Sequence, residues 1–245
     1  MAGVRITGLS KRYVIGKEAF FALEKMNLFI EDGSFTAIVG KSGCGKTTLL
    51  RLLCGLEEKT SGDIKFINRG SESNGSDEMR IGIMFQEPRL MPWLTIRENI
   101  AFSLFPKQKE IKKDADRHLQ TLGLELFKDA YPWQISGGMA QRTALGRALY
   151  YDPDIILMDE PFGALDYFTR KKLQNEMVSL FLNQKKTFVF VTHDIEEAVY
   201  LSEKVIVLEA GRIVQELPVE LPYPRKTNSP EFLNITEGIY KAIIA

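Results

Sequence analysis

One eight-residue loop has the residue types and the spacing of a polyphosphate site. Its residues are Gly40, Lys41, Ser42, Gly43, Cys44, Gly45, Lys46 and Thr47, which fit the pattern G-x-x-x-x-G-K-[ST]. The glycines let successive backbone N–H groups point inward toward phosphate oxygens. Lys46 would neutralise the β- and γ-phosphates, and the Thr47 hydroxyl would be a ligand of the accompanying Mg²⁺. We predict that this loop, with Thr48 at the start of the next helix, binds a nucleoside triphosphate.

Polar side chains also follow three apolar segments further along the chain. Gln86 follows 80–85, the pair Asp159 and Glu160 follows 155–158, and His193 follows 188–191. The carboxyl ends of parallel strands share one crevice, so these side chains would face the phosphate loop. Asp159 would hold Mg²⁺ through water, and Glu160 would polarise an attacking water. Taken singly, Gln86 would more often be a solvated polar group at a strand end, and a structural role would be favoured for His193.

Two further features have both a functional and a structural interpretation. Ser136, Gly137 and Gly138 begin a predicted helix over 139–149, and such a helix start offers backbone donors to an anion. An N-capped structural helix explains the same three residues. Tyr13 is a candidate surface for stacking a base, or a ring that packs on a sheet edge.

The elements that must position these residues alternate between apolar strands and helices. Strands are expected over 4–9, 35–39, 64–67, 80–85, 155–158, 188–191 and 204–208, and helices over 48–53, 107–123, 139–149 and 168–185. The alternating segment 26–30 and the turn at Asp32 and Gly33 predict a hairpin into strand 35–39. Residues 69–78 are expected to form a loop, and the prolines from 218 onward predict an extended tail.

Composition limits the classes of partner. Lysine plus arginine equals aspartate plus glutamate at 32 each, so no overall charge favours nucleic acid. Two cysteines, Cys44 and Cys54, are too few for a disulfide framework and suggest a reducing cytosol. No N-terminal leader and no apolar run of about 18 residues is evident, so we expect a soluble chain.

The order of these features resembles the nucleotide-binding subunit of ATP-binding cassette (ABC) transporters, over residues 13 to about 225. The phosphate loop, Gln86, Ser136–Gly138, Asp159 with Glu160, Asp166 and His193 match the family's Walker A, Q-loop, signature, Walker B, D-loop and switch histidine. The resemblance implies an α/β fold: a P-loop NTPase (RecA-like) parallel core sheet with an N-terminal antiparallel β subdomain and an inserted α-helical subdomain. It divides the chain into a core of 1–86 and 153–216, a helical part of 87–152 and a tail of 217–245.

The resemblance also implies a role for each matching residue. Tyr13 would stack on adenine, the loop with Lys46 would hold the phosphates of ATP, and three side chains would organise Mg²⁺: Thr47, Gln86 and Asp159. Glu160 would be the general base and His193 would contact the γ-phosphate. Ser136–Gly138 would act on the nucleotide of a second copy, so that two chains assemble head to tail.

Two residues depart from the family pattern or add to it. Met139 stands where the signature usually has glutamine, and because the glycines are intact we expect activity to survive. Cys44 lies beside Lys46, which would lower the pKa of its thiol and make alkylation a block to nucleotide.

Three segments resemble the nitrate, sulfonate and taurine importer group: 88–95, 161–166 and 221–225. The resemblance implies an ATPase at the cytoplasmic face of the cell membrane, beneath two permease subunits and served by an external solute-binding protein. The alternative is a cassette ATPase acting on nucleic acid or ribosomes, but the 90 positions between Lys46 and Ser136 leave no room for the long coiled coil of such proteins. A non-hydrolysing scaffold is disfavoured by four residues that hydrolysis would need, which are all present: Lys46, Asp159, Glu160 and His193.

Overall fold

A six-stranded sheet forms the centre of the computed structural model, which describes residues 2–68, 71–73, 79–102, 111–184 and 186–244. Its strands lie in the order β10-β9-β3-β8-β7-β6. They are β3 (Phe35–Val39), β6 (Ile81–Met84), β7 (Ile155–Asp159), β8 (Thr187–Thr192), β9 (Lys204–Glu209) and β10 (Arg212–Pro218). All neighbours are parallel except β9 and β10. The P-loop NTPase type of core predicted from the sequence is therefore confirmed.

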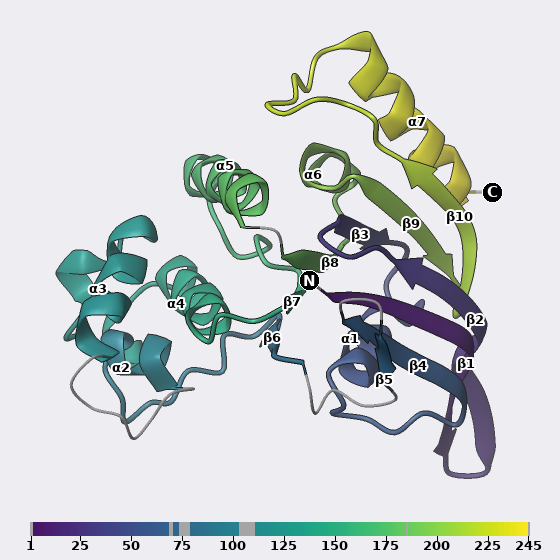
Figure 1. Cartoon of the computed structure of the whole chain (residues 1–245), viewed down its shortest axis with the longest axis horizontal. Coiled ribbons are helices and arrows are strands. Elements are labelled where there is room, and N and C mark those ends of the chain that lie inside the picture. The colour runs from purple at the N-terminus through teal and green to yellow at the C-terminus, as the bar shows by residue number, and fades with distance from the viewer. Residues whose placement is uncertain (1, 69–70, 74–78, 103–110, 185, 245) are drawn as a thin grey trace.

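A second, antiparallel sheet lies beside the first (Figure 1). It has the order β2-β1-β4-β5, formed by β1 (Ala2–Ile15), β2 (Glu18–Ile30), β4 (Ser61–Asn68) and β5 (Ser71–Ser73). The loop predicted over 69–78 is wrong at 71–73, because these residues pair with β4, whereas 69–70 and 74–78 lie outside the described residues.

The hairpin predicted between 26–30 and 35–39 is also wrong. β2 pairs with β1, with Val4 opposite Ile30, while both edges of β3 are occupied by β8 and β9. The turn at Asp32 and Gly33 therefore carries the chain from one sheet to the other. The alternation of 26–30 identified a strand but could not identify its neighbour.

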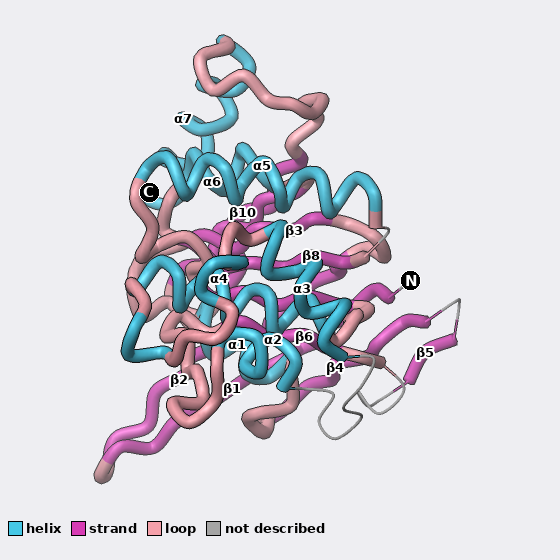
Figure 2. Tube along the Cα trace, turned by 90° about the vertical axis from the view of Figure 1, so that its left-hand side faces the viewer, coloured by secondary structure: helices cyan, strands magenta, loops and turns pink. Residues whose placement is uncertain are grey.

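The helices fall into two groups, which Figure 1 separates. Helices α2 (Ile96–Ala101), α3 (Ile111–Thr121) and α4 (Gly137–Tyr150) form one group, with short 3₁₀ turns at Glu125–Phe127 and Pro132–Gln134, and α4 packs against β6. The other helices are α1 (Lys46–Leu53), α5 (Tyr167–Asn183), α6 (Ile195–Leu201) and α7 (Pro230–Ile244). Of these, α1, α6 and α7 contact strands of the two sheets, and Figure 2 marks the helices in cyan and the strands in magenta. Of the helix predicted over 107–123, residues 107–110 lie outside the described residues. No helix in the described ranges is both long and apolar enough to cross a membrane.

Helix α7 corrects the prediction of an extended tail. Pro230 occupies its first position, where a missing N–H costs nothing. Phe232 and Ile239 are buried, and Ile235 and Ile243 pack beside them at helical spacing. The prolines at 218, 222 and 224 led to the prediction of an extended tail, but they affect only the end of β10 and the segment after it. The helix begins later, at Pro230.

Strand β3 shows how the sheet holds the phosphate loop. Phe35, Ala37 and Val39 are fully buried in the core under the helices, whereas Ile38 is buried in the core against α1 and β1. A strand that buries both faces has little freedom to move. The loop after β3 is therefore fixed by packing on both sides.

Candidate nucleotide site

The phosphate loop closes tightly onto its neighbours. Gly45 has a φ of +107°, and a Cβ there would lie 2.3 Å from the Ala22 carbonyl oxygen. A Cβ on Gly40 would lie 2.1 Å from the Leu208 carbonyl oxygen. Lys46 begins α1 and is buried, and its Nζ donates to the carbonyl oxygens of Gly40 (2.7 Å) and Lys41 (3.0 Å). The loop thus has the backbone close approaches that only glycine allows, with an ammonium group at its centre.

Glu160 is held by side chains from two other strand ends. Gln86 Nε2 donates to Glu160 Oε2 (3.1 Å), and His193 Nδ1 lies 3.1 Å from Glu160 Oε1. The Glu160 backbone has a φ of +47°, which is unusual for a residue with a Cβ. Its N–H donates to the Val191 carbonyl oxygen (2.9 Å). The structure therefore brings together Gln86, Glu160 and His193 from the ends of separate strands, as expected from the sequence.

Asp159 is buried beside the phosphate loop, where its carboxylate contacts Thr47. The residue is 5% exposed, and burial raises the pKa of its carboxyl, while a hydrogen bond with Thr47 opposes that shift. The donor set of Thr47, Asp159 and Gln86 offers only oxygen ligands, which Mg²⁺ prefers. A buried carboxylate is costly unless it is paired or coordinates a metal, so a bound divalent cation would offset the burial of Asp159. These residues fit Mg²⁺.

A cavity of about 720 Å³ opens above these groups. The predicted site residues that line it are Tyr13, Ser42, Gly43, Gly45, Lys46, Thr47, Thr48, Gln86, Glu160 and His193. Tyr13 donates to Glu57, and its ring contacts Phe20 with centroids 5.6 Å apart. Gly40, Lys41 and Cys44 of the same loop are not among the residues that line the cavity, and Lys41 pairs with Glu209 (3.3 Å).

The signature residues lie outside this cavity. Ser136 is the N-cap of α4, and its hydroxyl accepts from Met139 N (3.3 Å), as the sequence predicted. Asp166 is the N-cap of α5 and accepts from Phe168 N and Thr169 N, both at 3.1 Å. A Cβ on Gly138 would lie 3.2 Å from Leu165 Cδ2, so the two caps are close neighbours. Ser136, Gly137 and Asp166 are exposed. Within one chain they form a surface, not a pocket.

The expected reactivity of Cys44 is corrected by its burial. Desolvation raises the pKa of this thiol, although Lys46, whose Nζ lies 3.8 Å from the sulfur, acts in the opposite direction. The side chain is 6% exposed. The sequence showed the positive neighbour but not the burial, which outweighs it.

Several residues that line the cavity were not identified from the sequence. They are Val14, Ile15, Phe20, Ala22 and Arg51. Four belong to the β1–β2 hairpin, whose long pairing continues to Ile15 and Glu18. The available signal in the sequence was the apolar pair Val14 and Ile15 directly before the turn residue Gly16. In the structure these side chains are 62% and 70% exposed at the hairpin tip, where a bound ligand could cover them.

Comparisons with known proteins agree with this geometry. The family model described as "ABC transporter" matches residues 23–163. An aliphatic sulfonates import ATP-binding protein of Bacillus licheniformis is 43% identical over 92% of this chain and 89% of its own length. An uncharacterised ABC transporter ATP-binding protein of Methanocaldococcus jannaschii is 43% identical over 96% of this chain and 89% of its own.

The solved structures include a similar fold. The ATP-binding cassette MJ0796, in a dimeric post-hydrolysis state with ADP and Pi, superposes with a TM-score of 0.80 at 35% identity. The match covers 89% of this chain and all of that one. With the family model covering more than half of the chain, the protein belongs to the ABC transporter family.

Proposed function

We propose that this chain is the ATP-binding and ATP-hydrolysing subunit of an importer for a small solute. The observation that supports this most is the cavity of about 720 Å³, which gathers the phosphate loop, Gln86, Glu160 and His193. Binding, metal and water-activating groups converge there from different elements, as an ATPase site requires. The relatives named as sulfonate importers support a small anion of the nitrate, sulfonate or taurine type, or a related small molecule.

Binding of ATP would use groups that are already in place. Tyr13 at the cavity wall would stack on adenine, and the loop N–H groups would hold the phosphates. Lys46 would exchange its two loop carbonyls for phosphate oxygens. Thr47, Gln86 and Asp159 would hold Mg²⁺, which when bound neutralises charge on the phosphates.

Hydrolysis would depend on Glu160 as general base. Its carboxylate would accept a proton from the attacking water, and both of its oxygens are oriented by contacts with Gln86 and His193. His193 is 69% exposed at its side chain, so its ring can also contact a γ-phosphate. The amide oxygen of Gln86 would remain for the metal, because its contact with Glu160 uses the Nε2 group.

A second copy would complete the site. Ser136, Gly137 and Asp166 are exposed on one surface of the chain, away from its own cavity. Head-to-tail pairing would bring that surface over the partner's phosphates, and the dimeric cassette MJ0796 supports such pairing. Two bound ATP molecules would close the dimer and hydrolysis would reopen it.

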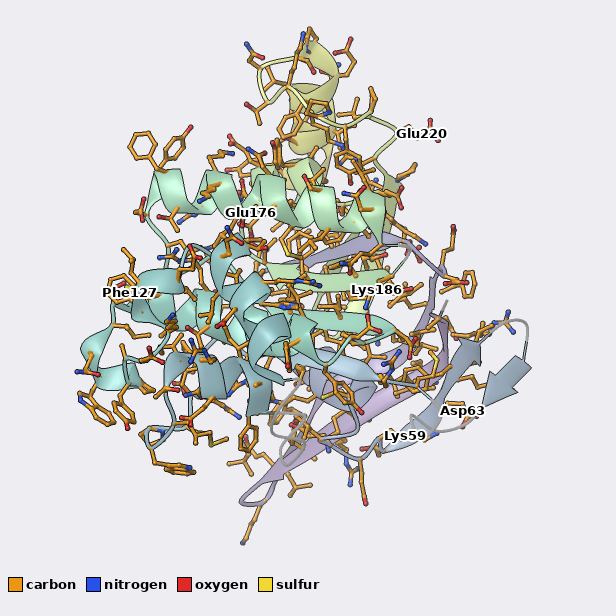
Figure 3. The ribbon with its side chains drawn as sticks, turned by 60° about the vertical axis from the view of Figure 1, so that its left-hand side comes forward. Lys59, Asp63, Phe127, Glu176, Lys186 and Glu220 are labelled. Atoms are coloured by element: carbon orange, nitrogen blue, oxygen red, sulfur yellow. The ribbon has the colours of Figure 1, made fainter. Side chains whose placement is uncertain are left out.

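The helical part of 87–152 would pass this motion to two permease subunits at the cytoplasmic face of the membrane, with a solute-binding protein outside. Its surface carries large exposed apolar side chains: Trp93 (69%), Leu126 (94%), Phe127 (40%) and Trp133 (67%). Figure 3 shows Phe127 at the outer edge of this helical group. Exposed apolar side chains of this size favour a protein partner over nucleic acid, for which the chain has no net positive charge.

The two histidines provide a matched test. His193→Ala should lower ATP turnover about 100-fold, because it removes a contact to the base and to the phosphate. His118→Ala, far from the cavity, should leave turnover within twofold. Equal turnover in the two variants would contradict the assigned site.

The membrane partner can be tested by expressing the chain together with permease genes that neighbour its own gene. The chain should then be recovered bound to permease subunits. Absence of the chain from the solubilised membranes would contradict the proposed role in an importer.

A further inference from the structure

Two polar contacts join α5 to α6 directly beside His193. Gln174 Nε2 donates to Glu197 Oε1 (3.1 Å), and Arg170 Nη1 lies 3.9 Å from Asp194 Oδ2. Asp194 follows His193 in the chain and caps α6, accepting from Glu197 N (3.0 Å). The backbone at His193 is therefore connected to α5 by both contacts.

The inner contact is buried and incompletely paired. Gln174 is 1% exposed and Glu197 is 6% exposed. Gln174 Oε1 has no hydrogen-bond partner among the described residues. A buried network that is only partly satisfied stabilises less than an apolar one, so stability does not explain why these side chains are polar.

The charges around Glu197 come from both helices. Burial raises the pKa of Glu197; the Thr192 hydroxyl opposes the shift, Asp194 adds to it, and Gln174 and Arg170 oppose it. No lysine or arginine in the described ranges forms a salt bridge with Glu197. Its position therefore depends on the Gln174 amide and the Thr192 hydroxyl, and Thr192 immediately precedes His193.

The start of α5, which carries Arg170 in its first turn, also lies at the signature surface. Asp166 caps α5, Arg170 N donates to Asp166 O (2.9 Å), and Arg170 Nη2 donates to Leu165 O (3.1 Å). Arg170 therefore contacts the loop at Asp166 and the cap beside His193 at the same time. The first two turns of α5 therefore link the surface that a second copy would cover to the backbone beside His193, the residue that contacts Glu160.

We propose that Gln174 and Arg170 are positioning residues for His193, acting through Glu197 and Asp194, and that α5 transmits contact at Asp166 to the histidine. This inference rests on the proposed function, because it gives His193 a task in hydrolysis. Neither Gln174 nor Arg170 lines the nucleotide cavity. Their effect should therefore fall on turnover and not on ATP binding.

The first test uses Gln174→Leu, which removes the amide and keeps the volume. We expect kcat to fall about tenfold with KM for ATP within twofold. The chain contains only two histidines, so imidazole NMR signals give a direct second readout. The His193 signal should shift in the variant, whereas the His118 signal should stay in place.

Tyr200→Phe is the matched control. It removes another bond between the same helices, from Tyr200 Oη to Asn175 Oδ1 (2.5 Å), at the end of α6 away from His193. The His193 signal and kcat should be unchanged in it. The double variant Gln174→Glu with Glu197→Gln keeps one amide and one carboxylate between α5 and α6. It should recover most of the turnover that Gln174→Leu loses.

Arg170→Met provides a second test of the inference if Gln174→Leu does not fold. The Arg170 side chain is one-third exposed, so we expect the chain to fold without it. It should shift the His193 signal and lower kcat at constant KM. Folded variants with an unmoved His193 signal, or a shift of the same size in Tyr200→Phe, would overturn the inference. An inactive wild-type chain would instead overturn the proposed function, and the NMR result would still stand on its own.

Discussion

The phosphate pocket and the helix start at Ser136 differ in how much of their geometry one chain supplies. In the pocket, Lys46 is buried with two carbonyl partners, and Glu160 is contacted by side chains from two other strand ends. The helix start is exposed, and the hydrogen bond of the Ser136 hydroxyl is with its own helix, at Met139 N. The pocket is therefore organised in advance, whereas in the proposed function the helix start would need the surface of a second chain. This difference predicts which substitutions affect binding and which affect only turnover.

The largest effect on ATP turnover is expected from a negative charge placed at the exposed helix start. Gly138→Glu adds an anion where the partner's phosphates would lie, and should lower ATP turnover about 100-fold. The chain should still fold, because the new Cβ would lie 3.2 Å from the flexible end of Leu165 and at ordinary contact distance, 3.9 Å, from the Ala164 carbonyl oxygen. Affinity for ATP, measured by fluorescence with a nucleotide analogue, should change less than threefold. A parallel loss of affinity would show that the two halves are not separate.

Alanine substitutions at two glycines compare the halves by stability. Gly45→Ala forces a Cβ to within 2.3 Å of the Ala22 carbonyl oxygen at a φ of +107°, and should destabilise the chain by about 2 kcal/mol. Gly137→Ala meets nothing within 4 Å and lies in a helix, so its effect should stay within about 0.5 kcal/mol. Urea denaturation without nucleotide measures both. Equal losses would mean that the pocket is no more constrained than the helix start.

The smallest effect concerns the exposed cap at Asp166. Its hydrogen bond with Thr169, together with the backbone donors, lowers the pKa of this carboxyl. A lowered pKa in the folded state contributes stability above the unfolded value, about pH 4, and this contribution disappears as pH falls through the folded value. Asp166→Asn keeps a cap that does not titrate. Its melting temperature relative to wild type should therefore rise as pH falls below about 4, and a constant difference would contradict the assignment.

The sequence predicted the strands and loops of the pocket well, because their signals are local. The apolar run Phe35–Val39 and the glycine spacing after it need no partner to be recognised. The neighbours of a strand are not local information, and the pairing of β2 with β1 was missed for that reason. Burial was missed in the same way at Cys44, whose thiol has a raised pKa despite its lysine neighbour.

Contacts between distant residues were the least predictable part. Arg225 is buried in the tail and donates to the carbonyl oxygens of Val199 and Ser202, both at 2.5 Å. Gln174 and Glu197 are separated by 23 positions and meet only because two helices pack side by side. Nothing in the pattern of one segment shows such a pair.

In the proposed function, one chain carries both halves of a site that only two chains complete. Light scattering of the Glu160→Gln variant with and without ATP tests it most directly, because loss of the base should keep ATP bound. We expect a monomer without nucleotide, a dimer with saturating ATP, and a monomer again when Gly138→Glu is added. A chain that stays monomeric with ATP bound, or that dimerises equally well with Gly138→Glu, would contradict it.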